Sequence, residues 1–410
     1  MIARRLCLGL ALLVSFSLNA WAAAYSVVCA INPGADINQV AAALKGEVVQ
    51  QVLDDAYLLS VKKLPGNPLP AGVQFCEQDW KTLLPGFSGA VVSVNGNVPR
   101  TWHGSQPALV LVNTAKAHTL STGRGIIIAD INSSVDYSHP ALRGVLTSGY
   151  DFVADRPAGN PSGSLNQSTA SFLDQSTASF LDQSTASFLD SVTASFLDQS
   201  TASFLDANNP AHGHGTMVAG VLAAVAPDSI IMPLRVFDDS GRADVSSIAK
   251  AIKYAVRHGA RVINMSFGVD DNSPTLKKAL GLAESANVIL VASAGNNNSS
   301  KKQYPAAYDT VIGVGATDLQ DRKAWFSNYD KSVDVAAPGV NIISSYPGGY
   351  YAVLSGTSFS APIVAGEAAL LLSLRSSGIE AAIYDGTKNT DYPMGHGRVD
   401  LFKALKKLLD

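Results

Sequence analysis

Hydrophobic and polar residues follow two distinct patterns along the chain of 410 residues. From about residue 107 onward, short apolar runs alternate with segments whose apolar positions recur with the 3.6-residue period of a helix. Runs such as 288–291 are apolar on both faces, which is typical of strands in a parallel sheet covered by helices. The pattern therefore predicts an α/β domain over 107–410, with a mainly parallel sheet flanked by helices. We expect strands at 125–131, 229–237, 261–267, 288–294 and 311–316, and helices at 216–226, 244–257 and 275–285.

A smaller unit precedes this domain. Its short strand patterns surround one amphipathic helical pattern, so residues 25–98 predict a small α+β domain. Residues 99–106 are mostly polar and contain Pro and Gly, which predicts a linker. We expect strands at 26–31, 47–51 and 56–61, and a helix at 35–44 that Gly46 closes.

Residues 167–206 interrupt the α/β pattern with five near-identical octads, four of which read QSTASFLD and one SVTASFLD. A repeat of eight keeps one face of a strand constant, but it drifts around a helix. The segment is either an extended surface loop or a small, self-associating β-layer. In both cases we expect an insertion in the α/β domain that lies outside its core.

The composition, with 47% hydrophobic and 15% charged residues, excludes a disordered chain. The formal net charge of −3 gives no reason to expect a nucleic acid partner. Residues 1–22 predict a secretory signal peptide, because Arg4 and Arg5 precede an apolar stretch that ends in the cleavage pattern Ala20-Trp21-Ala22. An uncleaved anchor is the alternative, although the stretch is short for a span. We expect no membrane span in the mature chain.

Two cysteines remain once Cys7 is removed with the signal peptide. In an oxidising compartment, Cys29 and Cys76 form either one disulfide or two separate buried thiols. No cluster of Cys and His has the spacing of metal ligands, so we expect no metal in the catalytic site.

Two motifs place a reactive side chain at the start of a predicted helix. In HGHGTMVAG (212–220), His214 can point into a cleft above the sheet, or it is an ordinary surface histidine. In GTSFSAP (356–362), Ser358 lies at a strand-to-helix turn, where the helix N-terminus favours the negative charge that nucleophilic attack creates. Alternatively, Ser358 only caps the helix.

A third motif, ASAGN (292–296), ends a strand with an asparagine whose amide can donate to a developing oxyanion. Taken in chain order, the three motifs resemble those of the subtilisin-like serine peptidases, or subtilases. The segment SFG (266–268) resembles their substrate-binding strand, and AAPG (336–339) and GHGRVD (395–400) resemble two further family motifs. The resemblance covers residues 107–410 apart from the octads.

This resemblance implies a subtilisin-like fold and a set of site residues. Ser358 would be the nucleophile, His214 the general base and Asn296 the oxyanion donor. The family needs no cofactor for its chemistry, although structural calcium is common in it. Ser266, Phe267 and Gly268 would bind the substrate. Four acidic residues in predicted loops are either calcium ligands or parts of solvated turns: Asp238, Asp239, Asp270 and Asp271.

The N-terminal domain resembles the subtilase propeptide, an inhibitor and folding chaperone with a ferredoxin-like fold. The match rests on the first strand, the helix ending at Gly46 and the strand YLLSV (57–61). The resemblance implies that this domain acts on the peptidase domain of its own chain. A separate interaction domain is the alternative.

The first catalytic segment departs from the family pattern. When it is aligned on Asp136 and His139, Asn132 stands at the catalytic aspartate and Ser134 at the glycine that follows. An aspartate there fixes the histidine tautomer and stabilises the imidazolium, whereas a neutral asparagine can present its NH₂ group and hold the wrong tautomer. In a related triad this exchange lowers turnover by about 10⁴-fold, which is roughly 5.5 kcal/mol of barrier.

Three features could compensate for Asn132. Asp130 lies on the same face of the strand, but about 6.6 Å further back. Asp136 follows the turn, where we expect it to serve the structure of the loop. Spontaneous deamidation of Asn132 would restore an aspartate.

Together these residues predict a secreted serine endopeptidase, extracellular or periplasmic, that forms an acyl-enzyme on Ser358 and is weakened at Asn132. Its substrates would be peptides bound in extended form by backbone pairing. One alternative is a pseudopeptidase that binds peptides or a partner without turnover, which Asn132 and Ser134 favour. Another is a structural surface protein that displays the octads. The intact Ser358, His214 and Asn296 favour the enzyme.

Overall fold

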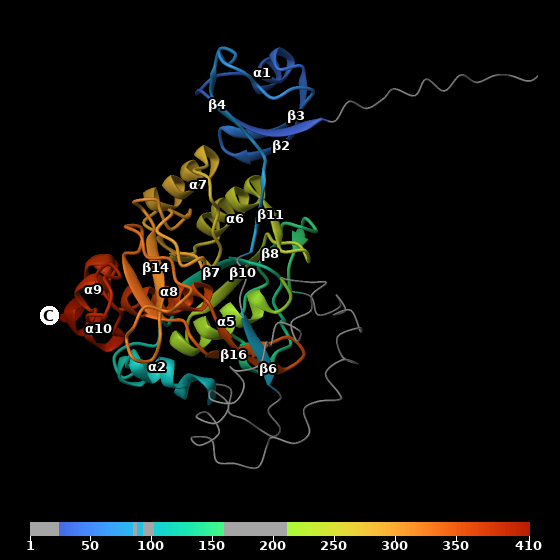
Figure 1. Ribbon diagram of the computed structural model, residues 1–410. Coiled ribbons are helices and arrows are strands. Elements are labelled where there is room, and N and C mark those ends of the chain that lie inside the picture. The colour runs from blue at the N-terminus through green and yellow to red at the C-terminus, as the bar shows by residue number, and fades with distance from the viewer. Residues whose placement is uncertain (1–23, 85–87, 93–101, 160–210) are drawn as a thin grey trace, which may run out of the picture.

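The structure is a computed structural model that describes residues 24–84, 88–92, 102–159 and 211–410 (Figure 1). The predicted signal peptide and the octads lie outside the described residues.

Within the described residues, eight strands form the central sheet of the large domain. Every pairing in it is parallel except that of the short β8 and β9, as the pattern of doubly apolar strands predicts. The strands, in their order across the sheet, are β15 (Val335–Pro338), β14 (Ile312–Thr317), β13 (Ile289–Ser293), β12 (Val262–Met265), β7 (Ile127–Asn132), β10 (Ile230–Arg235), β8 (Tyr150–Asp151) and β9 (Arg156–Pro157).

Helices cover both faces of this sheet. Ile128 and Val262 pack with α5 (His214–Val225) and α8 (Thr357–Leu372) on one face. Their neighbours in the chain, Ala129 and Ile263, pack with α6 (Val245–Arg257) and α7 (Pro274–Ser285) on the other. This alternation confirms the predicted α/β architecture. The other helices described from residue 102 onward are η1 (Trp102–Ser105), α2 (Pro107–Leu111), α3 (Thr114–Ala117), η2 (Pro140–Leu142), α9 (Ile379–Asp385) and α10 (Leu401–Leu409).

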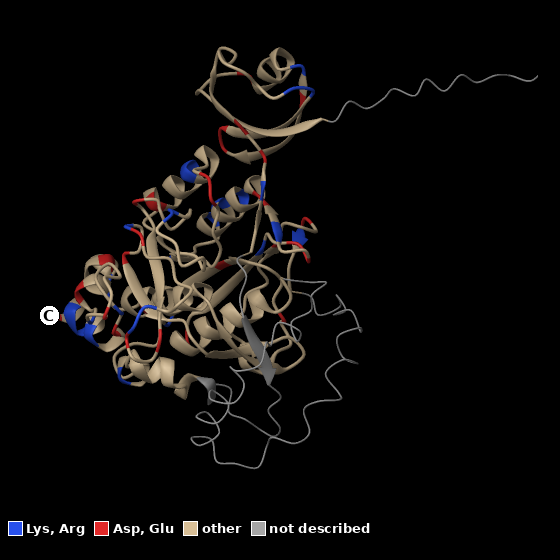
Figure 2. Cartoon of the chain, viewed as in Figure 1, with Lys and Arg blue, Asp and Glu red and all other residues tan. Residues whose placement is uncertain are grey.

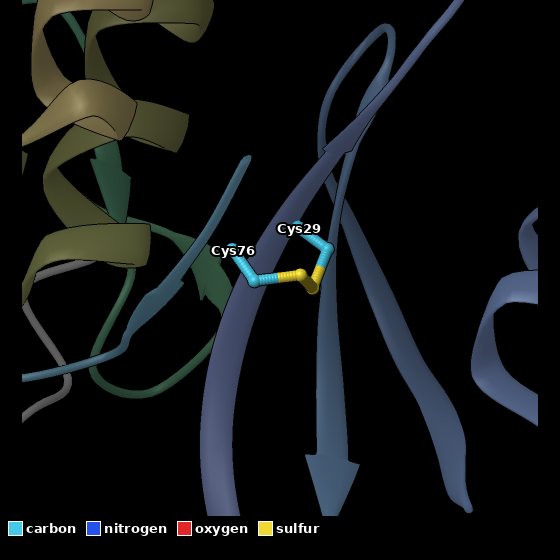
Figure 3. The surroundings of a disulfide bond; sticks show 2 residues. All are labelled: Cys29 and Cys76. Carbon is cyan, nitrogen blue, oxygen red and sulfur yellow. A yellow bond between two sulfur atoms is a disulfide. The ribbon is translucent and has the colours of Figure 1, made fainter. Parts of the chain in front are cut away.

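The N-terminal domain is an antiparallel sheet with one helix beside it. Of the two alternatives for Cys29 and Cys76, the structure has the disulfide, which joins two adjacent strands (Figure 3). The helix ends earlier than predicted, because Lys45 takes the left-handed conformation with φ of 54° and Gly46 already belongs to the next strand. The strands, in sheet order, are β2 (Gly46–Leu53), β3 (Ala56–Val61), β1 (Tyr25–Ile31) and β4 (Val73–Gln78), and the helix is α1 (Ile37–Ala43).

This sheet lies on α6 and α7 of the large domain (Figure 1). Acidic residues on the rim of the small domain face basic residues of those helices (Figure 2); Asp54 pairs with Lys253 and Arg257, and Asp55 with Lys278. These pairs are largely exposed and each contributes at most about 1 kcal/mol. The larger contribution comes from apolar contact, since Val28, Leu53 and Leu58 of the small domain join the core beneath the two helices.

Two strands of the N-terminal region pair with the large domain instead of the small sheet. They are β5 (Lys81–Leu83), antiparallel to β11 (Arg242–Asp244), and β6 (Ser88–Val92), antiparallel to β17 (Tyr350–Ser355), which also pairs with β16 (Ile342–Tyr346). The domain limit at residue 98 stays a prediction. The chain leaves the small sheet well before it.

Candidate active site

The residues singled out by the motifs converge where the parallel strands end. Asn132 is the last residue of β7, and Asn296 follows the end of β13. His214 is the first residue of α5, and Ser358 is the second residue of α8, which packs against α5. In open α/β sheets, binding sites form at the carboxyl ends of the strands. The fold therefore supplies the common edge on which four segments distant in sequence meet.

Asn132 contacts His214 directly. Its Oδ1 lies 2.7 Å from Nδ1 of the imidazole, and both side chains are buried. Because an amide oxygen carries no proton, this hydrogen bond requires the proton to be on Nδ1. The lone pair is then on Nε2, the atom that accepts the hydroxyl proton in a serine peptidase.

Two further contacts fix the orientation of the Asn132 amide. The backbone N–H of Ser133 donates to Oδ1 at 2.8 Å, and Nδ2 donates to Oδ1 of Asp130 at 3.3 Å. In this structure Asn132 presents its oxygen, and not its NH₂ group, to the histidine. The NH₂ group faces the opposite way because an acceptor lies behind it.

Burial governs the electrostatics of this side of the site. It lowers the pKa of His214 to about 3, because desolvation disfavours the imidazolium and Asn132 brings no charge to offset it. Burial raises the pKa of Asp130 to about 7, although the hydrogen bonds from Asn264 and Asn132 act in the opposite direction. The imidazole is thus held neutral, as a general base must be at the start of a reaction.

Ser358 is held by the segment that follows β12. Its hydroxyl donates to the backbone carbonyl of Ser266 at 3.3 Å, and its own carbonyl accepts from Oγ of Ser266 at 2.9 Å. The hydroxyl must therefore turn toward His214 before it attacks. In active sites without substrate, catalytic hydrogen bonds are often not yet formed in this way. The serine also lies in the first turn of α8, where backbone N–H groups favour a developing negative charge.

The amide of Asn296 is oriented by the same turn. Its Oδ1 accepts from the backbone N–H of Thr357 at 2.9 Å and from the Thr357 hydroxyl at 2.7 Å. With both of these donors on the oxygen, Nδ2 points to the neighbouring turn, where it lies 3.3 Å from the position that a Cβ on Gly356 would occupy. An N–H donor thus lies beside the serine, as an oxyanion site requires.

The three predicted substrate-binding residues take different positions. Ser266 contacts Ser358 as described, whereas the Phe267 ring is buried and packs against Phe237 at 5.3 Å between centroids. The backbone carbonyl of Gly268 accepts from the Thr82 hydroxyl at 3.2 Å, so the N-terminal region already contacts this segment. Phe267 therefore offers a bound peptide its backbone and not its ring.

Comparison with known proteins agrees with this geometry. The sequence model of the subtilase family matches residues 123–397. The chain belongs to the subtilase family. Thermitase from Thermoactinomyces vulgaris is 33% identical over 310 residues, which cover 72% of this chain and 94% of that protein. The thermophilic serine proteinase from Bacillus sp. (strain AK1) is 36% identical over 293 residues, which cover 68% of this chain and 61% of that protein.

The fold comparison gives the same result. Fervidolysin from Fervidobacterium pennivorans, a keratinolytic enzyme related to subtilisin, superimposes with a TM-score of 0.71 at 25% identity. The match covers 94% of this chain and 61% of fervidolysin. The chain therefore spans less than two thirds of both fervidolysin and the Bacillus proteinase.

The second departure of this subtilase, Ser134, causes no visible strain. Its backbone is outside the left-handed region that would demand glycine, and its side chain is exposed. The glycine that this segment requires is Gly215 of the facing helix α5, because a Cβ there would lie 2.6 Å from the carbonyl oxygen of Ser133. Asp136 serves the loop, accepting from Ser138 and from the backbone N–H of Gly348 at 2.9 Å.

The described residues contain no group of three or more His, Cys, Asp or Glu side chains that could hold a metal ion. Asp238 accepts from the backbone of Ser240 and Arg242, and Asp239 pairs with Arg235. We assign calcium no role.

The sequence reasoning missed two residues that shape the site. Thr357 orients Asn296, and Asn264 donates from Nδ2 to Oδ1 of Asp130 at 2.9 Å and to Oγ of Ser266 at 3.0 Å. A signal existed for Asn264, because it is a polar residue inside the apolar run Val262–Met265. Asp130 gives the same signal inside Ile127–Asn132. Buried polar side chains need hydrogen-bond partners, and Asn264 and Asp130 are hydrogen-bonded to each other.

Proposed function

We propose that this subtilase is an exported serine endopeptidase whose own N-terminal region occupies the active site until it is cut. The observation that carries the proposal is the pairing of two short segments, residues 81–83 and 88–92, with the large domain. On one side β5 pairs with β11 and contacts Gly268, and on the other β6 pairs with β17, which ends three residues before Ser358. An extended peptide substrate would bind by the same kind of backbone pairing.

In the proposed reaction, Oγ of Ser358 attacks the peptide carbonyl carbon while Nε2 of His214 takes the hydroxyl proton. The carbonyl oxygen becomes an oxyanion that accepts from Nδ2 of Asn296. The carbon–nitrogen bond then breaks as His214 protonates the leaving amine, which leaves an acyl group on the serine. Water, deprotonated by His214, releases the acid and restores the hydroxyl.

Asn132 supports this chemistry incompletely. Its oxygen holds the tautomer in which the lone pair lies on Nε2, but it brings no negative charge to stabilise the imidazolium. We therefore expect turnover below that of a subtilase with an aspartate at this position. The loss should be smaller than the roughly 10⁴-fold that follows when the wrong tautomer is held.

Contacts with the helices support an inhibitory and chaperone-like role for the N-terminal domain. Oε2 of Glu77 accepts from the backbone N–H of Thr275 at 3.0 Å, in the first turn of α7. Oδ1 of Asp79 accepts from the backbone N–H of Ser246 at 2.9 Å, in the first turn of α6. A carboxylate at a helix N-terminus contributes about 0.3–1 kcal/mol. The domain thus stabilises two core helices while it blocks the site.

Export is supported by the disulfide between Cys29 and Cys76, because such bonds persist in oxidising compartments. A search of the described residues finds no helix that is both long enough and apolar enough to cross a membrane. We propose that the mature protein acts outside the cytoplasm on extended peptides.

One observation favours the alternative of a pseudopeptidase that binds peptides without turning them over. Burial lowers the pKa of His214 to about 3, and its hydrogen-bond partner Asn132 is neutral, so Asn132 brings no charge to stabilise the imidazolium of the transition state. A site of this kind could bind a peptide and fail to cleave it.

The N-terminus of the purified protein distinguishes the two functions. Because the peptide path runs from β5 to β6, we expect self-cleavage between Leu84 and Ser88, upstream of the predicted linker. The matched control is Ser358→Ala, which should stay uncut.

A second experiment offers a mixed peptide library to the natural chain, to Ser358→Ala and to Asn132→Asp. Cleavage by Asn132→Asp alone would establish the pseudopeptidase, and equal cleavage by the natural chain and Ser358→Ala would refute the proposal.

A further inference from the structure

A continuous hydrogen-bonded line leads from the general base into the core. Nδ1 of His214 donates to Oδ1 of Asn132, and Nδ2 of Asn132 donates to Oδ1 of Asp130 at 3.3 Å. All three side chains are buried. Asp130 therefore does not replace Asn132 by reaching the histidine from further back along the strand. It contacts the residue that touches the histidine.

The orientation of the Asn132 amide decides whether His214 can act as a base, and an amide has two orientations that differ little in shape. In the observed one, Oδ1 accepts from two donors and Nδ2 faces an acceptor. In the reverse one, the NH₂ group would face the N–H of Ser133, and an oxygen would face an oxygen of Asp130. Both contacts would be repulsive, so the environment of Asn132 selects one orientation.

Asp130 is itself held in place by its surroundings. The same Oδ1 accepts from Nδ2 of Asn264 at 2.9 Å, and Asn264 continues through Oγ of Ser266 to the carbonyl of Ser358. Oδ2 has no hydrogen-bond partner among the residues that the structure describes. Any proton on the buried carboxyl can therefore sit on Oδ2 and leave Oδ1 accepting, so the arrangement survives in both protonation states.

We propose that Asp130 is a positioning residue for the peptidase reaction: it holds Nδ2 of Asn132 and thereby keeps Oδ1 of Asn132 on the Nδ1–H of His214. The inference rests on the proposed function. It assigns to Asp130 and Asn132 together the tautomer-fixing half of the work that a single aspartate does in other subtilases. Asn132 itself brings no charge for the other half, which is the stabilisation of the imidazolium.

The first test is a pair of variants at residue 130, assayed with peptides against Ser358→Ala as the blank. Asp130→Leu has a similar branched shape but no acceptor, and we expect kcat to fall by about tenfold or more as the amide loses its fixed orientation. Asp130→Asn is the matched control, because its amide oxygen can take the place of Oδ1. We expect it to stay within about threefold of the natural chain. Equal losses in the two variants would overturn the proposal.

The second test repeats Asp130→Leu in an Asn132→Asp chain. A carboxylate at residue 132 has two oxygens and no wrong orientation, so there the loss should vanish or become a gain. A merely structural role would lower activity similarly in both backgrounds. If Asp130→Leu does not fold, Asp130→Ser replaces it, because its hydroxyl ends one bond short of the Asp130 carboxylate oxygens. A loss of the same size in both backgrounds contradicts the assignment.

A third measurement needs no turnover and separates failure of this inference from failure of the proposed function. Nitrogen-15 chemical shifts of His214, assigned with a His214→Gln spectrum, report its tautomer in Ser358→Ala chains. We expect the Nδ1–H form with the natural Asp130 and with Asp130→Asn, and a mixture with Nε2–H in Asp130→Leu. An unchanged Nδ1–H form in Asp130→Leu would overturn the inference, whether or not the natural chain cleaves peptides.

Discussion

On the serine side of the active site, Ser358, Asn296 and Ser266 stand in motifs that resemble those of other subtilases, and they hold one another through short contacts with the first turn of α8. On the histidine side, the neutral Asn132 contacts His214, and a buried Asp130 lies behind it. In the proposed reaction, the serine side supplies hydrogen-bond donors to a developing charge. Asn132, in the proposed role of the aspartate, keeps the geometry of a triad but brings no charge. Geometry and charge, which one aspartate normally supplies together, are therefore separable here.

The largest expected effect comes from the serine side. Ser358→Ala should lower kcat/KM by about 10⁴-fold or more, because no other group can form the acyl intermediate. Peptide hydrolysis and the N-terminus of the purified chain both measure it. Ser358→Ala should lower kcat/KM to the same residual value in a chain that also carries Asn132→Asp. Residual cleavage that survives Ser358→Ala in either background would mean that the serine half is not the reacting half.

The next effect is a pH dependence of stability on the histidine side. Between about pH 4 and 7, unfolding frees Asp130 to ionise, so the natural residue costs stability as the pH rises. Asp130→Asn removes this cost. With both chains carrying Ser358→Ala, the free energy of unfolding of the Asp130→Asn chain, relative to that of the chain with Asp130, should increase by about 1.4 kcal/mol per pH unit, up to about 4 kcal/mol. Urea unfolding at several pH values measures the difference. A difference that does not change with pH would mean that the buried carboxyl has an ordinary pKa.

Asn296→Ala tests the oxyanion donor. We expect kcat to fall by about 10²–10³-fold, which is roughly 2.7–4 kcal/mol, with KM little changed, because the donor acts on charge that appears only in the transition state. Steady-state kinetics on one peptide separate the two constants. A rise in KM at constant kcat would assign Asn296 to substrate binding. Thr357→Val, which keeps the shape but removes one of the two donors to Asn296, should give a smaller loss in kcat.

The smallest of the four effects is expected from Asn132→Asp, which tests the histidine side of the site directly. Asn132→Asp restores charge without changing geometry, and we expect kcat to rise by about 10–100-fold. The carboxylate should also raise the pKa of His214, so the acid limb of the activity profile should move to higher pH. The pH dependence of kcat/KM measures both. A gain near 10⁴-fold would mean that Asn132 holds the wrong tautomer in solution, contrary to the contact of its oxygen with the histidine.

Sequence patterns predicted most of the frame on which the site is built. The five predicted core strands and three predicted helices all appear, and the strands are apolar on both faces because helices cover both sides of the sheet. The strand predicted at 125–131 begins two residues later and extends to Asn132. That shift matters, because it fixes the backbone of Asn132 by pairing with β10.

Other features could not be read along the chain. The pairing of β6 with β17 joins segments more than 250 residues apart, and local periodicity carries no information on such contacts. The left-handed residue after α1 is Lys45 and not Gly46, because either residue type can fill such a position. Glycine at 46 is required for another reason, since a Cβ there would lie 2.5 Å from the carbonyl oxygen of Ser60.

The sequence by itself determined the subtilase frame, the order of the motifs and the presence of asparagine at residue 132. Only the tertiary structure decided what that asparagine does. Whether the amide of Asn132 shows oxygen or nitrogen to His214 depends on the groups behind it, and Asp130, Ser133 and Asn264 come together there through the pairing of β7 with β12. An amide is nearly symmetric in shape, so its chemistry is set by its hydrogen-bond partners, and those are chosen by the fold.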